Sequence, residues 1–264
     1  MIILYFQGGI DMNFIPYWMQ AAFWGGLAGS ALIIGAMIGC FFDLKQRLVA
    51  SVMAFGSGVL ISALSFELIQ KAFEKGGFKS TAVGFIMGAV VYTIANYFVS
   101  KRGAKHRKRS NLKGKSHLDT SDAGALSIAI GAFIDGIPES FVIGLSIISG
   151  GTINLVTVLA IFISNIPEGL SSSAGMKRAG RSLKYIFSIW GSIALTSAIA
   201  SASGYMIFQG VGPVVVSMML AVAAGAILAM IVDTMIPEAF EETHDFAGLI
   251  TALGFLSAFM LSNL

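Results

Sequence analysis

The triplets Ile137-Pro138-Glu139, Ile166-Pro167-Glu168 and Ile236-Pro237-Glu238 each interrupt a long apolar stretch of the chain. A proline inside a helix removes one backbone hydrogen bond and presses against the carbonyl four residues earlier. Each triplet therefore leaves a backbone oxygen seeking a partner, and the glutamate adds a carboxylate beside it. The three triplets predict a helical protein with an oxygen-rich, negatively charged interior.

The composition of the chain excludes an ordinary soluble domain. Of its 264 residues, 56% are hydrophobic and only 12% are charged, and the mean hydropathy is +0.81. These values are typical of an all-α polytopic membrane protein. The single cysteine, Cys40, excludes a disulfide framework and a thiolate cluster for a soft metal.

Eight apolar stretches are long enough to cross a bilayer, which requires about 20 residues each. We expect one transmembrane domain over residues 12–264, because Leu4-Tyr5-Phe6-Gln7-Gly8 resembles a protease cleavage site left by an expression tag. Residues 1–11 are accordingly interpreted as a tag remnant. The predicted spans are 13–42, 48–73, 78–99, 123–149, 152–176, 183–209, 213–240 and 246–264.

Basic residues predict the orientation of these spans. Of the 17 lysines and arginines, 14 follow the first, third and fifth spans, and only Lys71, Lys75 and Lys79 fall on the other side. The positive-inside rule places the 14-residue side in the cytoplasm and both termini outside, in an inner or plasma membrane. The basic segment 100–122 is then a cytoplasmic loop whose charge anchors topology or meets lipid headgroups rather than nucleic acid.

Small residues and short links predict how the helices pack. Gly35 and Gly39, like Gly84 and Gly88, lie four residues apart, which allows close helix approach. The links Gly150-Gly151 and 210–213 are short, so the helices that they join should be antiparallel neighbours.

Ionisable residues inside the predicted spans are candidate functional groups, because their burial in hydrocarbon is costly. Asp135 and Glu139 are four residues apart, and Asn165 and Glu168 are three apart, so each pair shares a helical face. No lysine or arginine lies within these two helices. Packed carboxylates must then hold protons or be bridged by a cation. Further candidates are Glu67, Asp233 and Glu238.

Purely structural roles for these carboxylates remain open. Protonated acids that hydrogen-bond to hydroxyls such as Ser164, Ser171 and Thr234 would merely fix helix packing. For the cluster Glu238, Glu241, Glu242, His244 and Asp245, we expect a solvated cytoplasmic face, with a metal exit site as the alternative.

The helix-four stretch Asp135-Gly136-Ile137-Pro138-Glu139-Ser140 and the helix-five stretch Ser164-Asn165-Ile166-Pro167-Glu168-Gly169 resemble the paired motifs of the ZIP family of divalent-metal transporters. The resemblance extends over the chain that follows the leader. It implies an eight-helix bundle, a homodimer, and a metal site between helices four and five, with metal moving toward the cytoplasm. The metal ion is then the substrate, and no catalytic cofactor is expected.

Carried over by position, Glu139 and Glu168 match the family's ligand glutamates, which bridge two metals in the family pattern. Asp135 stands where the family usually has histidine, and Ser164 where glutamine or another polar residue is common. Asn165 matches a position of aspartate or asparagine, and Asp233 and Thr234 fall where His-Glu is frequent. Glu67 is assigned to a gate or an entrance ligand.

These departures give a metal site made of oxygen ligands alone, because His106, His117 and His244 all lie outside the predicted spans. Imidazole suits zinc and iron, whereas carboxylate and amide oxygens suit harder ions such as manganese. Zinc also binds carboxylates, so it remains first by family resemblance, ahead of manganese, iron or cadmium-like ions.

Three rival functions remain. One is a proton-relay transporter or channel that binds no metal. Another is an intramembrane enzyme, for which the sequence offers no set of nucleophile, base and orienting residue. A metal sensor is a third, although no sizeable soluble output domain is present. We expect a transporter rather than an enzyme.

Overall fold

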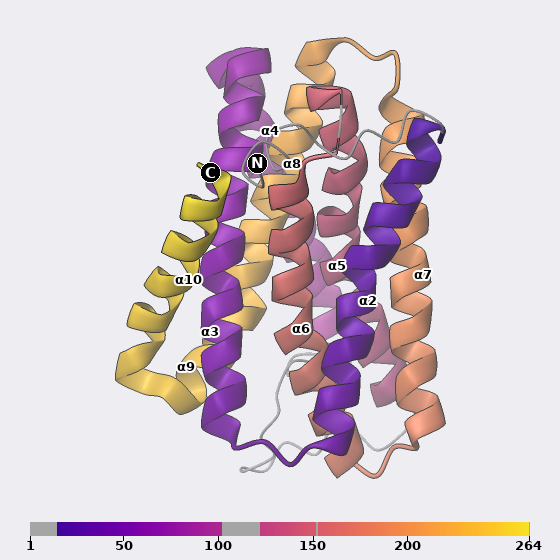
Figure 1. Cartoon of the computed structure of the whole chain (residues 1–264), viewed down its shortest axis with the longest axis vertical. Helices are drawn as coiled ribbons and strands as arrows, with labels where there is room; N and C mark the ends of the chain where they lie inside the picture. Colours follow the sequence, from indigo (N-terminus) through magenta and orange to yellow (C-terminus); the bar gives the residue numbers. More distant parts are fainter. Residues whose placement is uncertain (1–14, 102–121, 152, 264) are drawn as a thin grey trace, which may run out of the picture.

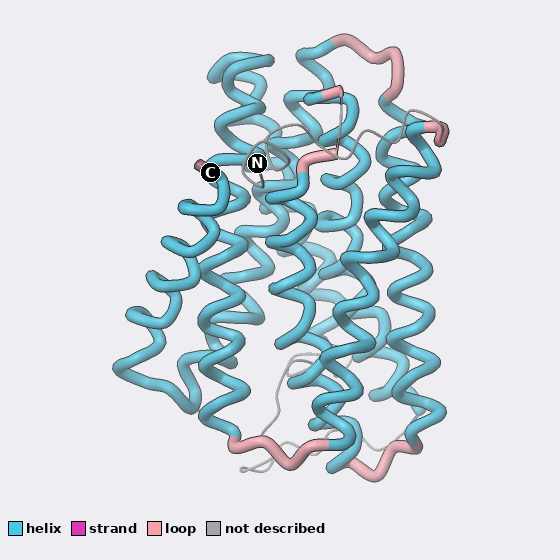
Figure 2. Tube along the Cα trace, in the orientation of Figure 1, coloured by secondary structure: helices cyan, strands magenta, loops and turns pink. Residues whose placement is uncertain are grey.

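The computed structural model describes residues 15–101, 122–151 and 153–263, and every regular element in these ranges is a helix. The helices lie side by side with roughly parallel axes, and the loops gather at the two ends of the bundle (Figures 1 and 2). The predicted tag remnant and most of the basic loop lie outside the described residues. The elements are α2 (Tyr17–Phe41), α3 (Gln46–Ala63), η1 (Leu64–Ile69), α4 (Gln70–Val99), α5 (Asp122–Gly150), α6 (Leu155–Arg178), α7 (Leu183–Phe208), α8 (Pro213–Met230), η3 (Ile231–Met235), α9 (Ile236–Thr243), η4 (His244–Phe246) and α10 (Ala247–Ser262).

Among the described residues, six continuous helical stretches are long and apolar enough to cross a membrane. Two of them, Gln46–Val99 and Pro213–Ser262, contain 54 and 50 residues, which as straight helices would be more than twice the thickness of the hydrocarbon core of a bilayer. Each changes direction once, at Gly77 (φ 72°, ψ 178°) and at His244 (φ 42°, ψ −114°). Figure 1 shows the second reversal, where α8 descends to α9 and α10 rises again.

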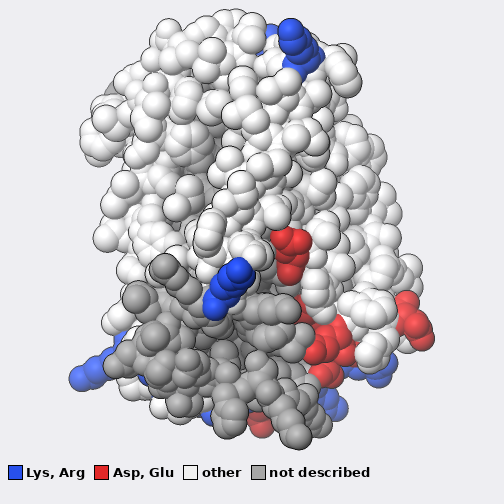
Figure 3. Space-filling view, turned by 180° about the vertical axis from the view of Figure 1, so that it is seen from behind, with Lys and Arg blue, Asp and Glu red and all other residues white. Residues whose placement is uncertain are grey.

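The surface of the bundle suits a bilayer. Large apolar side chains such as Ile86, Val91 and Ile94 on α4 are exposed. On the face seen in Figure 3, the upper half is almost uncharged apart from a basic patch at its upper edge. A long, exposed, apolar flank is the expected lipid contact of a transmembrane helix.

Glycines bring the helix backbones into direct contact, as their spacing predicts. A Cβ at Gly35 would lie 2.2 Å from the carbonyl oxygen of Ile166, so α2 and α6 touch through their backbones. A Cβ at Gly88 would lie 1.8 Å from the carbonyl oxygen of Val222, which joins α4 to α8 in the same way. The predicted role of these glycines in close packing is confirmed.

We group the helices into two blocks. Block A contains α2, α5, α6 and α7, which glycine contacts join to one another. Block B contains α3, η1, α4, α8, η3, α9, η4 and α10; within it, glycine contacts join α3 to α10 and α4 to α8, and η1 and η3 contact both α3 and α8. Among the described glycines, every approach below 3.0 Å to a neighbouring helix backbone joins helices of one block. Between the blocks, at Gly56, the nearest atom to an added Cβ is Cγ of Pro167, at 3.2 Å. The interface between the blocks is therefore packed through side chains.

The prediction that short links join neighbouring helices is wrong for two links. The helix α7 lies in block A and α8 in block B, although only a few residues connect them. Likewise, α5 packs mainly on α7 and α6 mainly on α2, and α5 and α6 touch each other only slightly. The small-residue faces, rather than the link lengths, decide which helices pair.

Candidate metal site

Asp135 lies on α5 at the interface between the blocks. Its carboxylate is 1% exposed, and Oδ1 accepts a hydrogen bond of 2.6 Å from the hydroxyl of Tyr92, on α4 of block B. That length lies within the ordinary range of O–H···O hydrogen bonds. Tyr92 was not among the sequence candidates, and a phenol within the apolar stretch 78–99 is the signal that could have found it.

Glu139 follows one turn later on the same face of α5 and is 2% exposed. Pro138 precedes it inside the helix, which continues to its end without a break. The hydroxyl of Ser140 donates to the carbonyl oxygen of Gly136 at 2.8 Å, within the same turn. The proline is thus accommodated in an intact helix, and Glu139 is carried by a rigid element.

The second motif lies on α6, where Ser164, Asn165 and Glu168 are all buried around Pro167. Asn165 donates from Nδ2 to the carbonyl oxygen of Ala28 on α2, at 3.0 Å. Ser164 donates back to the carbonyl of Ile161 at 2.9 Å, within its own helix. The Asn165 amide therefore ties α6 to α2, in addition to any ligand role of its oxygen.

Glu238 differs from the sequence expectation. It is 7% exposed, and its Oε1 accepts a hydrogen bond of 3.1 Å from the hydroxyl of Ser171 on α6. Ser171 is three residues after Glu168, so the third triplet approaches the helix that carries the second. The prediction that Glu238 belongs to a solvated face is wrong, because α9 packs against α3 and this carboxylate is buried in the bundle. The neighbouring Glu241, His244 and Asp245 are exposed.

The third proline also differs from the first two. Pro237 lies in the first turn of α9, directly after the π-helical turn η3. Met235 and Ile236 keep helical backbone angles, so the helical stretch continues past Pro237. All three prolines therefore lie inside continuous helical stretches, and Pro237 differs in directly following a π-helical turn.

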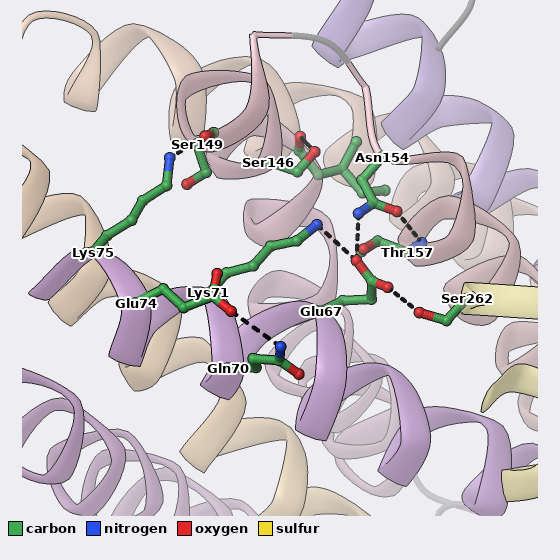
Figure 4. A network of polar contacts seen from close by, with 11 residues as sticks. Glu67, Gln70, Lys71, Glu74, Lys75, Ser146, Ser149, Asn154, Thr157 and Ser262 are labelled. Atoms are coloured by element: carbon green, nitrogen blue, oxygen red, sulfur yellow. Dashed lines mark hydrogen bonds and ion pairs between the residues drawn. The ribbon is translucent and has the colours of Figure 1, made fainter. Parts of the chain in front are cut away.

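Glu67 lies in the π-helical segment η1 and is the centre of a polar network that joins four elements (Figure 4). Its Oε2 pairs with the ammonium of Lys71 at 2.7 Å and also accepts from Nδ2 of Asn154, the N-cap of α6. Its Oε1 accepts from the hydroxyl of Ser262 on α10. Glu67 is consequently neutralised by a lysine one turn away, and through Asn154 it links the two blocks.

Asp233 lies in the second π-helical segment, η3, and is exposed. Nδ2 of Asn96 on α4 donates to its Oδ2 at 3.2 Å. On the face shown in Figure 3, acidic side chains reach the surface only in the lower half. Asp233 thus contacts α4 at an exposed position, whereas Asp135, Glu139 and Glu168 are buried.

The buried carboxylates do not converge on one point. Among the residues that the structure describes, no three His, Cys, Asp or Glu side chains gather closely enough to hold a metal ion. Asp135 and Glu139 share one face of α5, while Glu168 shares a face of α6 with Ser171. Hydrogen bonds from Tyr92 to Asp135 and from Ser171 to Glu238 show that both faces meet block B.

Membrane-length helices around buried carboxylates define a multi-pass membrane protein with an acidic interior. Comparison with protein-family models finds no match for the chain. The sequence is nevertheless 27% identical over 222 residues to the zinc transporter ZupT of Escherichia coli O7:K1 (strain IAI39 / ExPEC). It has the same identity to ZupT of the O1:K1 / APEC and K12 / DH10B strains, and each alignment covers 81% of this chain and 84% of the relative. These similarities confirm the resemblance to the ZIP family.

Proposed function

We propose that the protein is a membrane transporter that moves divalent metal cations toward the cytoplasm through a carboxylate-lined site in α5 and α6. Zinc is the first candidate, because the similar proteins from Escherichia coli are named zinc transporters. Manganese and iron are alternatives, because the candidate ligands are oxygen atoms. The cation is the substrate, and no catalytic cofactor is part of the proposal.

The burial of Glu139 and Glu168 carries this proposal. Both are at most 5% exposed within membrane-length helices, each directly follows a proline, and the two helices lie in one block. A carboxylate in such a place is expensive unless a cation, a proton or a hydrogen bond stabilises it. A cation that passes through the bundle would find negative charge where water is excluded.

The proposed ligands divide into two groups. Asp135, Glu139, Asn165 and Glu168 form the principal set on α5 and α6, and Ser164 adds a hydroxyl beside them. Glu238, which contacts α6 through Ser171, is assigned to the exit side of the path. Glu67 and Asp233 are assigned to assisting roles near the ends, because one is ion-paired and the other is exposed.

Ion transfer requires the carboxylates to come closer together, since no three of them gather among the described residues. The division into two blocks supports a simple route, in which block A moves against block B. The backbone contacts inside each block would persist, and the side-chain contacts between the blocks would change. Such a movement would expose the α5 and α6 carboxylates first to one side of the membrane and then to the other.

The proposed topology has eight crossings, with both termini outside the cell membrane. The two reversals, at Gly77 and His244, support this count, because each divides a 50- to 54-residue helical stretch in two. The links α2–α3 and α6–α7 carry basic residues and lie at the same end of the bundle, which we assign to the cytoplasm (Figure 1). A homodimer is proposed from the family resemblance.

Two other functions make different predictions. A proton-relay transporter would use the same buried carboxylates but bind no metal. An intramembrane enzyme would need an acid and a base positioned around a nucleophile or a bound water, and the similar proteins are named transporters. Metal dependence of transport separates all three.

Uptake into proteoliposomes tests the proposal. Purified protein is reconstituted, and uptake of zinc, manganese, iron and cadmium is measured for the wild type, Glu139→Gln and Glu168→Gln. We expect each variant to lose at least about tenfold in uptake, because glutamine keeps the shape but removes the charge that a cation needs. The matched control is Glu241→Gln, which changes an exposed carboxylate on α9. If no metal flux depends on either buried glutamate, the proposal is wrong, and proton flux without metal would favour the relay.

A further inference from the structure

Tyr92 is a buried phenol whose hydroxyl reaches across the interface between the blocks. It lies on α4 and is 2% exposed, and its oxygen is 2.6 Å from Oδ1 of Asp135 on α5. A buried tyrosine needs a hydrogen-bond acceptor for its hydroxyl, and a backbone carbonyl would satisfy that need. Here the acceptor is a carboxylate of the other block, so the contact involves a charged side chain of the candidate site.

The contact between Tyr92 and Asp135 orients the carboxylate. The phenol donates a hydrogen bond to Oδ1, at a distance within the range of O–H···O hydrogen bonds, about 2.5–3.0 Å. A carboxylate has two oxygens with about four acceptor positions, so the Tyr92 hydroxyl occupies one of them and restrains the rotation of the group. A carboxylate that accepts one hydrogen bond from a phenol is thus of the kind that can also coordinate a cation.

We infer that Tyr92 is a positioning residue for Asp135, and that it holds this carboxylate in the orientation in which it binds the transported cation. The inference rests on the proposed function. It adds a residue from block B beside the principal proposed ligands, which all come from block A. The hydrogen bond forms only in one relative placement of the two blocks, so Tyr92 orients Asp135 in that placement and not in the other.

This arrangement makes cation affinity depend on the position of the blocks. A ligand that is held in place loses little conformational freedom when it binds, whereas a freely rotating one must be ordered first. Asp135 is then a stronger ligand while Tyr92 holds it, and a weaker one after the blocks have moved. That difference would help to bind the cation on one side of the membrane and to release it on the other.

Replacement of Tyr92 by phenylalanine tests the inference, because it removes one oxygen atom and preserves the packed ring. Loss of a hydrogen bond to a charged group is expected to weaken the apparent affinity for zinc or manganese about tenfold. The maximal uptake rate should change much less than the KM. The matched control is Tyr97→Phe, on the exposed side of the same helix.

A double-mutant cycle separates positioning from simple packing. Wild type, Tyr92→Phe, Asp135→Asn and the double variant are compared for KM in proteoliposomes and for thermal stability in detergent. If Tyr92 acts through Asp135, its substitution should have little further effect on KM in the Asp135→Asn background. Loss of thermal stability with unchanged KM would show a packing role and overturn the inference, as would full additivity of the two effects on KM.

The same measurements distinguish failure of this inference from failure of the proposed function. Glu139→Gln is assayed in parallel. If it abolishes uptake while Tyr92→Phe leaves KM unchanged, only the role of Tyr92 is wrong. If Glu139→Gln transports metal normally, the proposed site is wrong, and the inference about Tyr92 fails with it.

Discussion

Substitutions at Glu67 can separate the charge of its carboxylate from its hydrogen bonds. Oε2 receives the ammonium of Lys71 and the amide of Asn154, and Oε1 receives the hydroxyl of Ser262 (Figure 4). The carboxylate is thus an acceptor for three donors from three other elements. Glutamine and alanine at this position remove different parts of that arrangement.

Glutamine can keep all three contacts. Its carbonyl oxygen can replace Oε2, which faces two obligate donors, the Lys71 ammonium and the Asn154 NH₂ group. Its NH₂ group then replaces Oε1 and faces the hydroxyl of Ser262, which can rotate and accept instead of donating. Only the negative charge is lost. Alanine, in contrast, removes both acceptors and leaves the donors of Asn154 and Ser262 without this partner.

The magnitudes follow from the exposure of the groups. The Lys71 side chain is 37% exposed, so its ion pair with Glu67 contributes at most about 1 kcal/mol, and Glu67→Gln should cost about that much. Glu67→Ala also loses two hydrogen bonds to a carboxylate that is only 8% exposed. Its cost should be about 2–4 kcal/mol, which corresponds to a fall in Tm of roughly 5–15 °C.

Thermal unfolding in detergent, followed by circular dichroism, measures both variants. Glu74→Gln and Glu74→Ala are matched controls, because Glu74 is exposed and accepts a single hydrogen bond, from Gln70 at 3.0 Å. Both controls should stay within about 0.5 kcal/mol of wild type. Equal losses of stability in Glu67→Gln and Glu67→Ala would refute this reasoning, because the charge of Glu67 alone would then account for the stability that the network contributes. A harmless Glu67→Ala would show that the network contributes no stability.

Two further variants test the packing of the blocks. Gly35→Ala places a methyl group 2.2 Å from the carbonyl oxygen of Ile166, so α2 must move away from α6. The free energy of unfolding should fall by about 1–3 kcal/mol in a denaturation assay. The control Gly191→Ala, whose added methyl group meets no neighbouring atom within 4 Å, should be neutral or slightly stabilising in the same assay. Ser171→Ala removes a donor from buried Glu238 and should cost about 1–3 kcal/mol by the same assay; an unchanged midpoint would mean that other groups satisfy this carboxylate.

Much of the candidate site follows from helical periodicity. The four-residue spacing of Asp135 and Glu139 predicts one shared face, and both are buried in the structure. Glu168 and Asn165 follow the same logic on α6. Their burial was predictable because polar groups in an apolar helix turn toward the protein interior rather than toward lipid.

Partners across helices were less predictable. Glu238 was expected in a solvated cluster, yet it contacts Ser171, 67 residues away in sequence. The sequence indicates Ser171 as one of several hydroxyls that could hydrogen-bond to a carboxylate, but it does not indicate which carboxylate. Such a contact depends on which faces of α6 and α9 meet, and sequence spacing within either helix carries no information about that meeting.

The sequence by itself determined the helical membrane character of the protein, the buried carboxylates of α5 and α6, and the glycines at which helix backbones touch. These properties are local, because hydropathy and the helical repeat act over a few turns. The tertiary structure alone decided that α7 and α8 separate into different blocks, that Asn154 and Ser262 meet Glu67, and that Tyr92 reaches Asp135. These properties depend on the packing of residues that are distant in the chain. When two helix backbones touch, their contact fixes the positions of both helices, and this decides which side chains they present to neighbouring helices.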